Sequence, residues 1–160
     1  MLARKTGSAK SFRLLVLASV ANLVSAGAVD ARAIRVWSDP ELVEKSDLVV
    51  IAIPTATNDT KERVGLPGLD HQPVVGVETK FEVIAVRKGE KSLKSLILHH
   101  YRVDGFTVPN GPNLVSFDIS KKQKFVLFLV REKDVRYAPT VGQVDPGVSG
   151  IRPEADRSSR

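Results

Sequence analysis

The adjacent histidines His99 and His100 are the first residues whose type could do chemistry. Imidazole is a common metal ligand and a general acid or base near neutral pH. The pair lies in an apolar segment typical of a strand, where successive side chains point to opposite faces. One histidine is predicted to face the interior or a sheet edge and the other the solvent. His71 with one of the pair is the alternative site, but we expect no metal or other cofactor.

Hydrolytic chemistry could be sought in Ser95, His100 and Asp104, yet the chain has no G-x-S-x-G elbow to present a nucleophile. The carboxylates Glu78 and Glu82 flank Lys80 on the outer face of a predicted strand, a pattern of surface charge and not of a catalytic pair. A glycine-rich phosphate loop is also missing. The sequence therefore predicts no catalytic residues and a protein that is not an enzyme.

The first 28 residues have the pattern of a cleaved signal peptide. Its basic residues are Arg4, Lys5, Lys10 and Arg13, and an apolar run follows over 14–21. Ala26 and Ala28 have the spacing that a signal peptidase accepts, so cleavage is predicted between Ala28 and Val29, with a second site after Ala33. The run is too short to span a bilayer, which needs about 20 apolar residues. We expect a secreted or periplasmic protein.

Export changes how the charge is interpreted. The chain carries 24 basic and 18 acidic residues, a net charge of +6. Without the four basic residues of the signal peptide, the chain has 20 basic and 18 acidic residues, a net charge of +2. Near-neutral charge is poor support for a nucleic-acid partner. The chain has no cysteine, which excludes thiol catalysis, thiolate metal sites and a lipid-modified cysteine.

One short helix is predicted after a connector over 29–38. Ser38 and Glu41 have the spacing of a capping box, and Pro40 suits a first helical turn. The helix is expected to end near Lys45 or Ser46, with Leu42 and Val43 facing inward. Trp37, just before it, is expected to pack against the helix as a staple, with a binding-surface anchor as the alternative reading.

The other elements are predicted to be strands. Leu48–Ile53 is apolar on both faces, and Pro54 is expected to end that strand or to mark an edge. The stretch 55–69 is expected to be a long loop. Its N-x-T pattern at Asn58 is an acceptor sequence for glycosylation, but we expect a solvated turn there. Val74–Glu90 alternates until Ile84 and Ala85 intervene, which indicates a β-bulge that bends the strand.

The second half continues the pattern. Further strands are predicted over 93–103, 124–130 and 136–141, with a turn-rich loop over 104–112. Residues 115–119 are compatible with a short strand or one helical turn. From Pro146 to Arg160, glycine, serine, proline and charge predict a disordered tail. The fold class is all-β, a small five-stranded OB-like closed barrel over 39–145 with one short N-terminal helix, preceded by a signal peptide.

Four segments together resemble the netrin-like module, an OB-type barrel shared with tissue inhibitors of metalloproteinases and with exported bacterial proteins. They are Glu41–Ala52, Thr79–Gly89, Ser95–Leu98 and Phe117–Leu129. The resemblance implies a scaffold whose loops bind a partner. The inhibitors chelate a protease's zinc through an N-terminal cysteine, which this chain lacks, so the resemblance does not imply that mechanism.

A partner surface is predicted in the loops over 55–69 and 104–112 and around the hairpin between them. Its individually named residues are Lys88, Lys91, Lys94, His99, Tyr101, Arg102, Phe106 and Asn110. We expect an exported, non-catalytic binding or interaction module whose partner is another exported protein or a cell-envelope component. Two alternatives are an inhibitor of an exported hydrolase or protease, with a fixed N-terminus beside the 104–112 loop, and an OB domain that binds a polyanion.

Overall fold

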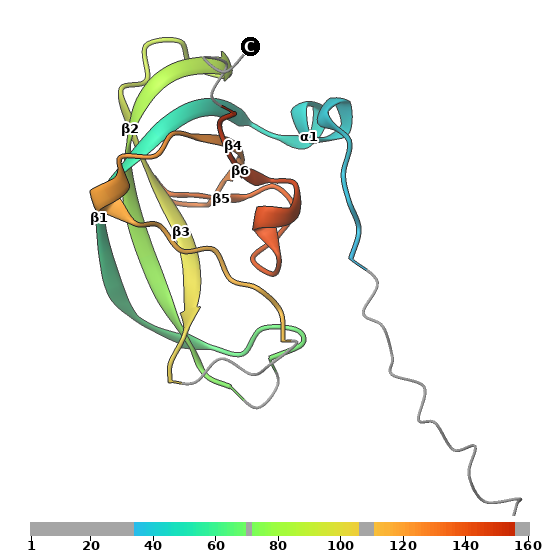
Figure 1. The fold of residues 1–160 in the computed structure, drawn as a ribbon, viewed down its shortest axis with the longest axis vertical. Coiled ribbons are helices and arrows are strands. Elements are labelled where there is room, and N and C mark those ends of the chain that lie inside the picture. Colours follow the sequence, from blue (N-terminus) through green and yellow to red (C-terminus); the bar gives the residue numbers. More distant parts are fainter. Residues whose placement is uncertain (1–33, 70–71, 106–110, 156–160) are drawn as a thin grey trace, which may run out of the picture. The chain divides into compact units, whose positions relative to one another are not determined.

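The computed structural model describes residues 34–69, 72–105 and 111–155. The strands of this part form one mostly antiparallel sheet of six strands in the order β1-β2-β3-β5-β4-β6, and β4 also pairs with β1, which closes the first five into a barrel. Figure 1 shows the strands wrapped around a common interior. The predicted five-stranded OB-like barrel is confirmed. Among the described residues, no helix has the length and hydropathy to cross a bilayer.

Helix α1 spans Asp39–Lys45 and begins as predicted. The backbone N–H of Ser38 donates to the Glu41 carboxylate at 2.9 Å, which is one half of a capping box. The same contact lowers the pKa of Glu41. Leu42 is fully buried, but Val43 is 42% exposed, so the expectation that both face inward is wrong for Val43. A helix of two turns has only a narrow buried stripe, and Val43 lies outside it.

Strand β1 runs from Leu48 to Val64. Its first five residues are buried, as the doubly apolar pattern predicted. The prediction that Pro54 ends this strand is wrong, and so is the predicted loop over 55–64, because β1 continues along β2 to Val64. The alternative that Pro54 marks an edge agrees with the pairing, since β1 has no β4 partner beyond Ala52. Register shifts near Pro54 accommodate the proline, and the polar residues over 55–59 are exposed because the strand has left the core there.

Strand β2, Val74–Lys88, bends where the sequence predicted. Ile51 pairs with Ala85 and Ala52 pairs with Val83, so Ile84 has no partner opposite it and forms a bulge. Ile84 is 47% exposed, whereas Val83 and Val86 on either side pack against the core. The bend lets β2 pair with β1 along most of its length and with β3 at its other edge, as Figure 1 shows.

The remaining elements close the barrel. Strand β3 is Ser95–Val103, β4 is Phe125–Arg131, and β5 is Tyr137–Pro139. The undecided stretch before β4 contains a 3-10 turn, η1, at Ile119–Lys121. Part of the expected tail is ordered instead, because η2 (Pro146–Val148) leads to β6 (Ile151–Pro153), which pairs with β4.

The main core lies inside the barrel and contains residues from β1, β2, β3, β4 and β6. Phe117 packs edge-on against Phe81 and Phe125, with ring centroids 5.0 and 5.1 Å apart. A second cluster lies under α1, where Trp37 packs with Leu42 and Phe128. Trp37 therefore packs against the helix region as predicted. The guanidinium of Arg35 lies 3.9 Å from its ring.

Candidate functional site

The two adjacent histidines point to opposite faces of β3, and both are buried. His99 is 4% exposed and His100 is 3% exposed. The opposite directions agree with the prediction, but the expectation that one histidine faces the solvent is wrong. The outer face of β3 is covered at His99 by side chains from β1 and from the β4–β5 turn, which hydropathy alone does not reveal.

His100 lies inside the barrel. Its Nε2 is 2.8 Å from the Thr79 hydroxyl, and its ring packs edge-on against Phe117. Burial lowers the pKa of His100 to about 4, so this imidazole is neutral at physiological pH. A neutral histidine enclosed by the core is a structural residue and has no route to a substrate.

The outer face of β3 is covered at His99 because of an irregularity in β1. Asp59 pairs with Val77 and Arg63 pairs with Val75, so three residues of β1 lie opposite the single residue Gly76. The Thr60 hydroxyl donates to the Gly76 carbonyl at 3.1 Å. This bulge carries the Glu62 side chain over β2 and towards β3.

His99 is held between two carboxylates. Its Nδ1 lies 2.9 and 3.0 Å from the two Glu132 oxygens. Its Nε2 lies 3.0 Å from Glu62 Oε2, an ion-pair distance that lacks the alignment of a hydrogen bond. An imidazole can donate to both carboxylates only when both ring nitrogens are protonated.

Tyr101 and Arg136 complete this polar cluster. The Tyr101 hydroxyl donates to Glu62 Oε1 at 2.7 Å. Burial, together with that hydrogen bond and the negative charge of Glu62, raises the pKa of Tyr101. Arg136 donates to Asp134 at 2.8 Å and to Glu78 at 3.2 Å, and its Nε lies 3.4 Å from Glu132.

This arrangement ties β1, β3 and the β4–β5 turn together and leaves His99 almost fully buried. The two ring nitrogens of His99 face opposite carboxylates, so the three groups do not converge on a common point. Within the described ranges, no group of three or more histidine and acidic side chains is arranged to hold a metal. The cluster is a structural device that joins β1, β3 and the β4–β5 turn.

The predicted basic residues lie at the two ends of β3. At one end, the Lys88 ammonium donates to the carbonyls of Val43 and Glu44, and Lys91 donates to the carbonyl of Val86. Lys94 is exposed at the same end. At the other end, Arg102 is paired with Asp59 through its Nε at 2.9 Å and also through Nη2.

The charge of Arg102 is therefore largely compensated within the chain, and the pairing lowers the pKa of Asp59. The remaining predicted positions lie outside the described residues; they are Phe106, Asn110, Ala28, Val29 and the His71 of the alternative metal site. The same is true of the N-terminus that an inhibitor was expected to fix beside the 104–112 loop.

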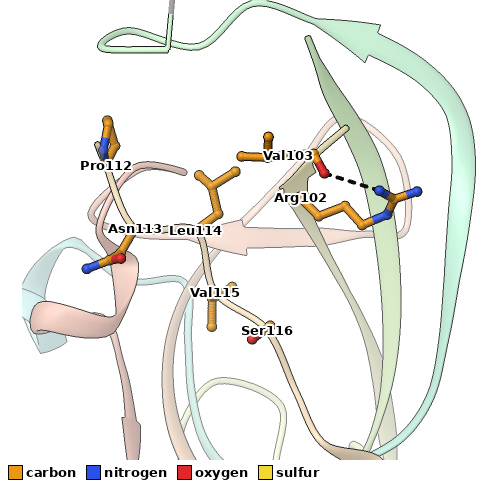
Figure 2. A pocket seen from close by; sticks show the side chains of 7 residues that line it. All are labelled: Arg102, Val103, Pro112, Asn113, Leu114, Val115 and Ser116. Carbon is orange, nitrogen blue, oxygen red and sulfur yellow. Dashed lines mark hydrogen bonds between the residues drawn. The ribbon is translucent and has the colours of Figure 1, made fainter. Parts of the chain in front are cut away.

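A hollow of about 300 Å³ lies at the C-terminal end of β3, where residues 112–116 pass it (Figure 2). We call it the β3-end pocket. It is lined by Arg102, Val103, Pro112, Asn113, Leu114, Val115 and Ser116. Figure 2 shows the Arg102 guanidinium turned back to the Val103 carbonyl, a hydrogen bond of 3.2 Å. Leu114 packs with Val103 and Tyr101 in a satellite core below.

The segment beside the pocket is fixed by two reciprocal hydrogen bonds between Asn113 and Asp145. The Asn113 N–H donates to the Asp145 carboxylate, and the Asp145 N–H donates to the Asn113 carbonyl, both at 2.8 Å. The pocket wall is therefore anchored to the stretch that leads into β6. The side chains of Asn113 and Ser116 remain exposed.

Sequence reasoning missed Glu62, Glu132 and the 112–116 wall. Gly76 was an available signal for the first, because an isolated glycine within a strand often marks a close backbone approach. Glu132 reaches His99 from the turn after β4, and the 112–116 wall is held by Asp145, so both depend on contacts between distant segments that have no local signature.

No family model and no curated protein matches the chain.

Proposed function

We propose that this chain is an exported binding or interaction module whose partner contacts the β3-end pocket. The observation that carries the proposal is the pocket itself, an open hollow with an anchored wall at one end of a closed barrel. Its lining mixes aliphatic side chains with an exposed amide and an exposed hydroxyl, which is typical of binding sites.

The composition of the lining favours binding over catalysis. Among the described residues that line the pocket, Arg102 is the one with an ionisable side chain, and it is paired with Asp59. Ser116 has no histidine or carboxylate beside it in that lining to act as its base. Such a site can recognise a surface but has no pair of groups for proton transfer.

Export and the class of partner come from the sequence. The basic n-region, the apolar run and the small residues before Val29 support export, and a partner in the same compartment follows from it. The resemblance to the netrin-like module is part of this proposal and rests on the four sequence segments named above. We propose as partner another exported protein or a component of the cell envelope.

A site-specific photo-crosslinker tests the proposal. The complete gene is expressed in its own organism with benzoyl-phenylalanine at Ser116, or at Gln123 as an exposed control outside the pocket. We expect one crosslinked species in the exported fraction from position 116 and none from position 123. No adduct at 116, or the same adducts at both positions, contradicts the proposed surface.

The mass of the exported chain tests the other half of the proposal. Processing before Val29 is expected, with Ile34 as the alternative first residue. A chain that keeps its first 28 residues and stays inside the cell contradicts export, whatever the crosslinking result.

A further inference from the structure

The barrel wall is incomplete at the N-terminal end of β3. β3 and β5 are joined by one residue pair, Leu98 with Tyr137. Before Leu98, the residues Ser95–Ile97 pair with β2 on one side, and no strand of the described part pairs with them on the other. This stretch of β3 is therefore a free strand edge three residues long.

The direction of the peptide groups can be worked out from two hydrogen bonds. The Val83 N–H donates to the Lys94 carbonyl at 2.9 Å, so the peptide groups of Lys94 and Leu96 face β2. Those of Ser95 and Ile97 face the opposite way by alternation. Farther along the strand, Gln143 donates to the His99 carbonyl at 3.0 Å, which continues the same alternation. The N–H and C=O groups of Ser95 therefore point away from β2, and no strand of the described part pairs with them.

A hollow of about 380 Å³ lies along this edge, and we call it the β3 notch. It is separate from the β3-end pocket, with which it shares no lining residue. Its walls include the apolar side chains of Leu93 and Ile97 and the ring of Tyr137. Val135, at its rim, is 71% exposed, so apolar surface here is uncovered.

Two cations flank the notch. Lys80 and Arg131 line it, both are exposed, and neither side chain is ion-paired within the described part of the chain. Glu90 also lines it and accepts a hydrogen bond from the Ser92 hydroxyl at 2.6 Å. Among the lining residues, two cations and one carboxylate leave one excess positive charge beside an apolar wall; the Asp47 carboxylate, which accepts the Arg131 backbone N–H at 2.8 Å, is not part of the lining.

We propose that the β3 notch binds an extended peptide segment of another protein, in which apolar residues alternate with acidic ones. The segment adds as a strand to the edge at Ser95–Ile97. Its main chain bonds the outward peptide groups, its apolar side chains cover Val135 and Tyr137, and its carboxylates reach Lys80 and Arg131. This inference goes beyond the proposed function, because it concerns a different surface.

The length of the edge limits the mode of binding. Three residues offer few main-chain hydrogen bonds, so affinity depends on the side-chain contacts and on the two cations. We therefore expect weak, salt-dependent binding that is lost when the cations are neutralised.

NMR titration of the ¹⁵N-labelled full chain tests the proposal. The probe is acetyl-Val-Glu-Val-Glu-Val-amide, and the matched control peptide has lysine in place of glutamate. We expect saturable shifts of the Ser95 and Ile97 amides with the acidic peptide and none with the basic one. The amides of Val103 and Leu114 report on the β3-end pocket separately, so the two proposals can fail independently.

Variants complete the test. Lys80→Gln with Arg131→Gln is expected to weaken binding at least tenfold, whereas Lys124→Gln, at an exposed lysine outside the notch, is expected to leave it within twofold. Ser95→Pro removes the outward N–H at the first residue of the strand, where proline is tolerated, and is expected to weaken binding by less than the double charge variant does. The charge variants keep the test valid if this variant does not fold.

Three results overturn the proposal: no saturable shift with the acidic peptide, equal shifts with both peptides, or a response spread outside the notch. Concentration-dependent dimerisation that shifts Ser95 and Ile97 without peptide also overturns it, because a second copy then occupies the edge.

Discussion

Glu62 lies directly over Gly76, and this contact makes the polar cluster on the outer face of β3 possible. A Cβ atom on Gly76 would lie 2.9 Å from Glu62 Cβ and 2.5 Å from the Thr60 hydroxyl oxygen. Only a residue without a side chain leaves room for the β1 bulge to cross β2 at this height. The carboxylate can then reach Tyr101 and His99.

Gly76→Ala is expected to destabilise the fold by about 1–3 kcal/mol, because the bulge must move away from β2. Gly65→Ala is the matched control, since a Cβ there meets no atom within 4 Å, and its effect should stay within about 0.5 kcal/mol. Urea unfolding measures both. Similar free energies of unfolding for the two variants would show that the bulge does not press on β2.

Tyr101 should ionise at higher pH than an ordinary tyrosine, because it is buried and donates to Glu62. The chain has two tyrosines, so alkaline titration of absorbance at 295 nm resolves few transitions. Glu62→Gln removes the negative charge and should bring the Tyr101 transition to lower pH. A titration curve unchanged by this substitution would contradict the contact.

Because of His100, the folded chain is expected to lose stability at mildly acidic pH. Its pKa is about 4 in the folded chain against 6.5 for the free side chain. Between these values the unfolded chain takes up a proton that the folded chain does not, so acid favours unfolding. Stability should fall by about 3 kcal/mol as the pH decreases from 6.5 to 4.

His100→Gln is the variant for this test, because its amide can still contact the Thr79 hydroxyl but does not titrate in this range. The free energy of unfolding of the variant should depend less on pH between 6.5 and 4. The depressed pKa values of Asp59 and Asp134 act at lower pH, so they do not mask the effect. Parallel curves for variant and wild type would refute the assignment.

Phe81 and Glu82 test the faces of the bent strand. Phe81 is fully buried against Phe117, whereas Glu82 is exposed. Phe81→Ala should cost roughly 3–5 kcal/mol and Glu82→Ala almost nothing. Chemical denaturation compares the two, and equal losses would mean that the strand faces are assigned incorrectly.

Local sequence patterns predicted correctly those elements of the fold that depend on interactions between residues close in sequence. The capping box at Ser38 and Glu41 and the bulge at Ile84 depend on residues close in sequence, and both are present. The same reasoning failed at Pro54 and over 55–64. Pairing with β2 holds that polar stretch as a strand, and a proline at a register shift does not break it.

The candidate sites were less accessible to sequence reasoning. Alternation along β3 correctly separated His99 from His100, but the cover over His99 comes from Glu62 and Glu132, which lie 37 residues before it and 33 residues after it in the chain. The two hollows depend on how β3 meets β5 and the 112–116 segment, a long-range contact without a local pattern. The basic residues were also a misleading guide to the partner surface, because Arg102 is paired with Asp59 and is not a free basic residue.

The central claim is that the exported chain binds its partner through the β3-end pocket. The most direct measurement is the affinity of the crosslinked partner, once purified, for wild type and for a variant that carries Asn113→Arg and Ser116→Arg. Both side chains are exposed at the pocket, so the barrel should fold normally. Calorimetry should show at least a tenfold loss of affinity for this variant and no change for Gln123→Arg, whereas equal affinity for all three proteins would contradict the claim.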